Sequence, residues 1–319
     1  MSTQPIDVSG IAAAFASLRE AVGRVVVGQE EAVRLAFITF LCAAHSLIEG
    51  VPGVAKTLLV KTLAASVAVR FGRVQFTPDL MPSDILGTSI FDPRDATIRF
   101  RSGPLFTDLL LADEINRASA KTQSALLEAM QERTATIDGQ RHALGEHFTV
   151  FATQNPVEQE GTYPLPEAEL DRFLFKIVMD YPSEEQERAL LTLHHAGDRT
   201  PEALAPVLQA AEISAVRGIV TRVIVRDEII AYTTQLIRAT RNDLSFSLGA
   251  SPRAGVMLLR AAKANAALEG RDYVLPEDVQ EMWLPALRHR VQLDPAAEVE
   301  GLNADEALRR TLRGVAVPR

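Results

Sequence analysis

The sequence GVPGVAKT occupies residues 50–57 and stands between two patterned segments. An apolar run over residues 45–49 precedes it, and an amphipathic segment over residues 57–69 follows it. This order predicts a buried strand, a tight glycine-rich turn and a helix. In such a turn, successive backbone N–H groups and the helix N-terminus point at one spot, which creates an anion site.

The spacing of this turn is that of a Walker A loop. Lys56 would reach the β- and γ-phosphates of a nucleotide, and the Thr57 hydroxyl would bind Mg²⁺. Ala55 stands where the usual loop has glycine. An alanine costs little there unless the position requires a positive φ. Taken alone, the stretch could also be a tight strand-to-helix connection with a solvated lysine.

Short apolar runs alternate with amphipathic segments up to about residue 181. This pattern is typical of a parallel sheet with helices on both faces, so the predicted fold class is α/β with a five-stranded αβα core. We expect strands over residues 45–49, 74–77, 109–113, 149–153 and 173–179, and helices over residues 10–22, 30–44, 57–69 and 121–131.

After residue 182 the strand patterns mostly disappear and helix starts take their place. Asp227 precedes a helical segment that runs to about residue 240, and Ser251-Pro252 supplies a cap and a first-turn proline for another through residue 267. Asp278 lies early in a further short helix. The sequence therefore predicts a core over residues 1–182 and an all-α domain over residues 183–319.

The composition is that of an ordinary globular protein of about two domains. The 319 residues are 47% hydrophobic and 23% charged, which argues against disorder as the main state. The apolar stretch over residues 35–44 is too short for a membrane span, and the N-terminus lacks the pattern of a secretory signal. The single cysteine, Cys42, excludes an intramolecular disulfide and a multi-cysteine zinc site. The net charge of −8 argues against bulk DNA binding, and we expect a cytoplasmic protein.

A second motif is LLLADE over residues 109–114, an apolar strand that ends in two acids. Strand alternation sends the two side chains to opposite faces, so they can do different work. Asp113 would hold Mg²⁺, and Glu114 would polarise an attacking water. An acid pair after a buried strand is often a simple strand end, but its position downstream of a phosphate loop is that of a Walker B strand.

Polar and basic residues follow in the order that a nucleotide-hydrolysing site requires. Asn155 comes after the apolar strand in FATQNP and could hydrogen-bond the lytic water or the γ-phosphate. Arg172 precedes the last predicted strand, and Arg253 opens a helix of the second domain. Arginine stabilises the charge that spreads over a transferred phosphoryl group.

Two segments interrupt the alternation. Residues 76–106 are rich in Pro, Gly and Asp and contain a possible hairpin whose return strand covers residues 97–101. Residues 134–137 and 140–144 flank Asp138-Gly139, which is a two-residue hairpin signal. Long insertions in a compact domain are more often functional than idle.

Together these motifs resemble the AAA+ ATPases of the MoxR type. The resemblance rests on GVPGVAKT, LLLADEINRASAKTQSALLEAMQER, FATQNP, GTYPLPEAELDRF and GASPRA, and it covers nearly the whole chain. It implies an ATPase core with a helical lid, ATP and Mg²⁺ as cofactors, and assembly into rings that are usually hexamers. It also implies that the two insertions are the helix-2 insert and the pre-sensor-1 hairpin, which face the ring pore or one ring face.

The resemblance assigns roles to individual residues. Lys56 and Thr57 would be the Walker A pair, Asp113 and Glu114 the Walker B pair, and Asn155 sensor 1. Arg253 would be sensor 2, Arg172 the finger that completes a neighbour's site, and Arg117 a second candidate for an intersubunit contact. The nucleotide-binding residues would be Val27, Gly28 and Gln29 at the adenine, with Gly50, Val51, Pro52, Gly53, Val54, Ala55, Lys56, Thr57, Leu58 and Asp113.

The partners are also implied by the resemblance. Family members are commonly paired with proteins that bear a von Willebrand factor A domain, and are thought to act as chaperones on client complexes. Two alternatives stay open: a scaffold that binds ATP with little turnover, and a DNA motor of the same branch. The filled catalytic positions argue against the scaffold. The hairpin tip, residues 137–142, holds one acid and one arginine, which argues against nucleic acid.

Overall fold

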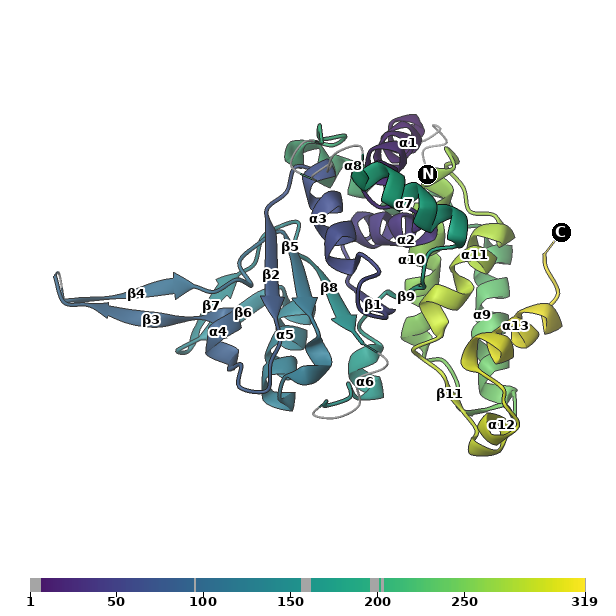
Figure 1. Ribbon diagram of the computed structural model, residues 1–319. Coiled ribbons are helices and arrows are strands. Elements are labelled where there is room, and N and C mark those ends of the chain that lie inside the picture. The colour runs from purple at the N-terminus through teal and green to yellow at the C-terminus, as the bar shows by residue number, and fades with distance from the viewer. Residues whose placement is uncertain (1–6, 95, 156–161, 196–200, 202–203, 319) are drawn as a thin grey trace.

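The computed structural model contains the predicted parallel sheet, with helices packed on both of its faces (Figure 1). The structure describes residues 7–94, 96–155, 162–195, 201 and 204–318. The strand order is β2-β5-β8-β1-β9, and every neighbouring pair is parallel. The five strands are β1 (Ser46–Gly50), β2 (Phe71–Gln75), β5 (Leu109–Asp113), β8 (Thr149–Gln154) and β9 (Phe175–Met179).

Each face of the sheet supports its own hydrophobic core. Along β5, Leu109 and Leu111 enter one core while Leu110 and Ala112 enter the other, because successive side chains of a strand point to opposite faces. The first face is covered by α1 (Ser9–Gly23), α2 (Glu30–Leu41) and α3 (Lys56–Ser66). The second is covered by α4 (Pro82–Leu86) and α5 (Ala120–Glu132). The predicted α/β fold class is confirmed.

The chain after β9 is mainly helical. The first core continues without a break into these helices, since Phe37 of α2 and Leu258 of α10 belong to the same cluster. The elements are α7 (Glu184–His195), α8 (Ala210–Arg222), α9 (Asp227–Asn242), β10 (Phe246–Leu248), α10 (Pro252–Leu268), α11 (Pro276–Leu287), β11 (Gln292–Leu293), α12 (Pro295–Val299) and α13 (Ala304–Gly314). Within the described residues, no helix combines the length and apolar character that crossing a bilayer requires.

Both predicted hairpins form. Strands β3 (Gly87–Asp92) and β4 (Thr97–Ser102) pair as an arm that extends away from the body of the molecule (Figure 1). Strands β6 (Thr134–Ile137) and β7 (Gln140–Ala143) are joined by Asp138 and Gly139, which have φ of +50° and +79°. Positive φ at both central residues is the requirement of the tight turn that Asp-Gly predicts. Two short elements complete the chain, the 3₁₀ helix η1 (Ile115–Arg117) and α6 (Glu167–Leu170).

Several predicted boundaries are wrong by a few residues. The helix expected to reach residue 44 ends at Leu41, and Ala43 has a left-handed φ of +45°. The helix expected over residues 57–69 ends at Ser66. The strand expected over residues 74–77 is β2, which begins and ends earlier than predicted. Its limits follow from pairing with β5, in which Phe71 lies opposite Leu109 and Gln75 opposite Asp113. The β10–β11 pair in the helical part was not predicted.

Candidate active site

The parallel sheet brings the predicted motifs to one edge. Strands β1, β5 and β8 are neighbours, so their carboxyl ends lie side by side, as is usual for ligand sites in open α/β sheets. A cavity of about 400 Å³ opens there. It is lined by Pro52, Gly53, Ala55, Lys56, Thr57, Leu58, Asp113, Glu114 and Asn155. The lysine of the loop, both acids and the strand-end asparagine thus share one cavity.

The loop depends on two glycines for different reasons. A Cβ on Gly50 would lie 2.5 Å from the Met179 carbonyl oxygen, so close packing of β1 on β9 requires glycine there. Gly53 has φ +89°, a conformation that L side chains rarely adopt. Ala55 also has a left-handed backbone, with φ +64°, so this alanine does occupy a position that favours glycine. The expected cost is about 1 kcal/mol.

Lys56 begins α3 and folds back across the loop. Its Nζ donates to the Gly50 carbonyl oxygen at 2.6 Å and to the Gln154 carbonyl oxygen at 3.4 Å. The ammonium therefore lies between the ends of β1 and β8, next to Asn155. A cation at this place, beside a helix N-terminus, favours bound anions.

The two acids have different surroundings, as strand alternation predicts. Asp113 is buried, accepts a bond from the Thr153 hydroxyl at 2.6 Å and pairs with Arg73 Nη2 at 2.7 Å. Glu114 leaves the strand with φ +56° and is more exposed. Its carboxylate accepts from Gln75 Nε2 at 2.7 Å and pairs with Arg117 Nη1 at 3.0 Å.

Sequence reasoning missed the residues that hold this pair in place. Arg73 and Gln75 lie on β2, and Thr153 on β8 also accepts the Glu114 backbone N–H at 2.9 Å. The alternation of polar and apolar residues over residues 71–75 indicates one polar face, but not that this face meets the end of β5. Arg117 was expected at a subunit contact, and here it pairs with Glu114 of its own chain.

Asn155 is 6% exposed and lies at the end of β8, where the sequence placed it. The following Pro156, and Gly161 of the GTYPLP motif, lie outside the described residues.

Residues 27–29, which the resemblance predicts at the adenine, lie next to the end of β9 and do not line the described cavity. Gln29 Nε2 donates to the Asp180 carbonyl oxygen at 3.0 Å. Gly28 has φ +79°, and a Cβ there would lie 2.7 Å from the Gln186 side chain of α7. Val27 is half-buried, while Val51 and Val54 pack against the first core.

The remaining predicted arginines do not line the cavity either. Arg172 is half-buried, and Arg253 is exposed in the first turn of α10. Asp171 was not predicted as a site residue, but it connects the segment that contains Arg172 to the segment that contains Arg253. Its carboxylate accepts from Ser251, two residues before Arg253, at 3.1 Å and from the buried Arg290 at 2.8 Å.

Comparison with known proteins identifies the family. The family model described as "ATPase family associated with various cellular activities (AAA)" matches residues 45–175, and the AAA lid domain model matches residues 238–311. The chain is 42% identical to Chaperone MoxR1 of Mycobacterium tuberculosis over 99% of this chain and 86% of that one. It is 45% identical to the uncharacterised protein YeaC of Bacillus subtilis, over 94% and 93% of the two chains.

A solved structure agrees with these relatives. The crystal structure of a protein from Cytophaga hutchinsonii, described as a candidate ATPase, superimposes with a TM-score of 0.90. It is 39% identical and covers 98% of this chain and 97% of its own. Motif order, sheet order and these similarities agree: the chain belongs to the AAA+ ATPases of the MoxR type.

Proposed function

We propose that the chain hydrolyses ATP in a Mg²⁺-dependent reaction and uses it to drive a ring-shaped remodelling motor. The observation that carries this proposal is the single cavity of about 400 Å³ that contains Lys56, Thr57, Asp113, Glu114 and Asn155. A cation and a helix N-terminus face two acids and an amide across it, which suits a polyanion whose terminal phosphate meets water.

The proposed roles follow from position. The start of α3 and Lys56 bind the phosphates, with Lys56 exchanging its carbonyl partners for phosphate oxygens. Glu114 orients the attacking water and takes its proton, since it is the more exposed acid of the pair. Asn155 donates from its amide to the γ-phosphate or to the water. Val27, Gly28 and Gln29 contact the adenine.

The residues present fit a magnesium ion. The Thr57 hydroxyl and the Asp113 carboxylate both line the cavity, and oxygen donors of these kinds are what Mg²⁺ prefers. Asp113 already accepts from Thr153 and Arg73, but a carboxylate has about four lone-pair sites. When bound there, the ion would supply Lewis-acid chemistry that neutralises the charge developing on the phosphate.

We further propose that the site is completed between subunits. A core over residues 1–182 and a lid over residues 183–319 would close on nucleotide, with Arg172 acting on a neighbouring subunit and Arg253 sensing the γ-phosphate. In support, neither arginine lines the cavity of its own chain within the part that the structure describes.

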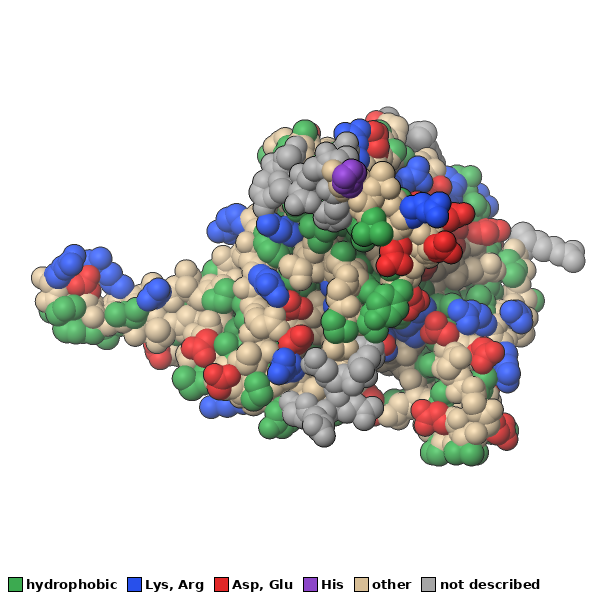
Figure 2. Space-filling view, in the orientation of Figure 1, with side chains coloured by type: hydrophobic (Ala, Val, Ile, Leu, Met, Phe, Trp, Pro, Cys, Tyr) green, Lys and Arg blue, Asp and Glu red, His purple; other side chains and the backbone are tan. Residues whose placement is uncertain are grey.

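The motor's output would be remodelling of a protein client. One relative is named a chaperone, and the β3–β4 arm offers a contact element. Figure 2 shows basic and hydrophobic side chains gathered at the far end of this arm, where Phe91 is 59% exposed and Ile98 is 74% exposed. A hexameric ring and a partner with a von Willebrand factor A domain remain part of this proposal.

The Glu114→Gln variant tests the chemistry. It should bind ATP with unchanged affinity and lose most turnover, about a hundredfold or more, because the amide cannot accept the water's proton. Lys56→Ala is the matched control and should lose ATP binding itself. Turnover of Glu114→Gln at the parent rate would remove Glu114 from this role.

A further inference from the structure

The two sides of α10 carry cavities that the nucleotide site does not use. One cavity, of about 270 Å³, lies between α9 and α10. The other, of about 340 Å³, lies between α10, α8 and the end of α2. Val256 and Leu259 of α10 line both cavities, so the two form a single groove divided by these two side chains.

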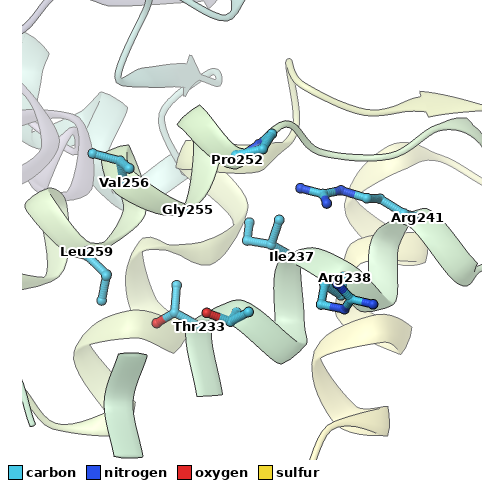
Figure 3. A pocket seen from close by; sticks show the side chains of 9 residues that line it. Thr233, Ile237, Arg238, Arg241, Pro252, Gly255, Val256 and Leu259 are labelled. Carbon is cyan, nitrogen blue, oxygen red and sulfur yellow. The ribbon is translucent and has the colours of Figure 1, made fainter. Parts of the chain in front are cut away.

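The walls of this groove are apolar. Figure 3 shows Val256 and Leu259 on one helix and Ile237 projecting from the other, with Arg238 and Arg241 beyond Ile237. In the second cavity, Leu41 and Val220 continue the apolar lining. Val256 is 66% exposed, which is unusual for a large apolar side chain between two hollows.

The charges around the groove are of one sign. Its lining includes Arg238 and Arg241 on one side and Arg217, Arg260 and Lys263 on the other, and no carboxylate among the described residues. None of the five forms an ion pair within the described ranges. Arg217 donates to the Phe40 carbonyl oxygen at 2.8 Å, Lys263 to the Thr221 carbonyl oxygen at 2.8 Å, and Arg260 to the Cys42 carbonyl oxygen.

Carbonyl oxygens satisfy these donors without neutralising them. Burial lowers the pKa of Arg217 to about 10, with Arg133 and Arg260 adding repulsion, while Cys42 and Glu146 raise it. The Glu146 carboxylate, which acts on Arg217, also accepts a bond from the Ser214 hydroxyl. Among the described residues that line the groove, five are cationic and none is acidic, so its lining carries a net positive charge.

We propose that this groove docks an acidic segment of a partner protein, with one large apolar side chain in each cavity. The opposite charge of such a segment matches the five cations, and its apolar residues would cover Val256 and Leu259. A second copy of this chain fits less well. The β3–β4 arm of a second copy is itself basic, with Arg99 and Arg101, so it would be repelled by the groove. Helix α7 has an acidic first turn, but it offers one strongly exposed apolar residue, Leu191, for two cavities.

Selection from a displayed library of 16-residue peptides against the full-length chain tests the docking. Enriched peptides should be acidic and contain at least two large apolar residues. A selected peptide, made synthetically and followed by fluorescence anisotropy, should bind Val256→Glu at least about tenfold more weakly. It should bind Arg238→Glu several-fold more weakly, and its binding should weaken as salt is added.

Leu244→Glu is the matched control, because Leu244 is 94% exposed and lies outside the groove. That variant should bind the peptide as the parent does. Two results would overturn the proposal: enrichment of no acidic peptides, or equal binding by Val256→Glu. Sedimentation of Val256→Glu that differs from the parent would instead assign the groove to a contact between copies, which also overturns it.

Discussion

His45 shows how one buried side chain makes stability depend on pH. Its Nδ1 accepts the Val150 backbone N–H at 2.9 Å, so the ring proton lies on Nε2, 3.1 Å from the Met130 carbonyl oxygen. A second proton would break the Val150 bond. Burial, reinforced by Arg133, lowers the pKa of His45 to about 3. His289 is buried against the Phe173 carbonyl oxygen, and burial lowers its pKa well below the ordinary value.

The free energy of unfolding should therefore fall as the pH drops below 6.5. In that window the unfolded chain binds protons at these histidines and the folded chain does not, so stability is lost toward acid, by up to about 1.4 kcal/mol per pH unit for each group. Urea denaturation between pH 7 and pH 4.5 measures the slope. His45→Asn should reduce it, whereas His195→Gln, at an exposed position, should not. Equal slopes for His45→Asn and the parent would contradict this account.

Arg73 is a cation that competes for Asp113. Its Nη2 lies 2.7 Å from the carboxylate that we propose as a magnesium ligand. Arg73→Gln should lower the Mg²⁺ concentration for half-maximal ATPase activity several-fold, because a competing positive charge is removed. Arg70→Gln is the control, since Arg70 pairs with Asp108 at the opposite end of β5. An unchanged or higher Mg²⁺ requirement would argue against the role of Asp113.

At the scale of elements, three consecutive residues after α11 fasten the helical part to the sheet. Arg288, His289 and Arg290 each contact backbone carbonyl oxygens of the segment from Asp171 to Lys176. Arg290 is 1% exposed at its side chain and pairs with Asp171 at 2.8 Å. Although burial lowers the pKa of Arg290 to about 10, Asp171 opposes the shift, and the guanidinium stays charged at neutral pH.

Asp171→Asn should therefore lower the free energy of unfolding by about 3–5 kcal/mol, since it leaves a buried charge uncompensated. Denaturant unfolding measures the loss. Combining it with Arg290→Met should cost less than the sum of the two single changes, because they share one interaction. Asp305→Asn, which breaks the more exposed pair with Arg288, should cost about 1 kcal/mol or less. If Asp171→Asn costs no more than Asp305→Asn, the buried pair of Asp171 with Arg290 does not stabilise the fold as proposed.

Elements whose limits depend on local sequence could be predicted, and those limited by distant partners could not. The prediction of β5 over residues 109–113 is confirmed, because a run of apolar residues marks the strand and the acid Asp113 marks its end. The end of α2 could not be predicted from the local sequence. Arg217 and Arg260, which lie far along the chain, donate to the carbonyl oxygens of Phe40 and Cys42 at this end. The same limit explains why the shared cavity could be inferred from motif order, but the clamp of Gln75 on Glu114 could not.

At the scale of the whole molecule, one of the two hydrophobic cores runs from the sheet into the helical part, so the two parts share side-chain packing. The cavity holds the loop, both acids and Asn155, while Arg172 and Arg253 lie outside it among the described residues. If Arg172 acts on the transferred phosphoryl group, as we propose, it therefore does so in the site of a neighbouring subunit. Specific ATPase activity should then rise with protein concentration and saturate as subunits associate, which steady-state assays with matched sedimentation would show.

Mixing of inactive subunits gives the sharpest test of this arrangement. Arg172→Ala subunits keep a complete phosphate loop but cannot assist a neighbour, whereas Lys56→Ala subunits lack the loop lysine but keep Arg172. In an equal mixture, about a quarter of the junctions join an intact loop to an intact Arg172, so activity should return toward a quarter of the parent value. Mixing each variant with the double variant is the control, because no such junction can then form. Activity no higher than the mean of the two separate variants would mean that Arg172 does not act across the junction.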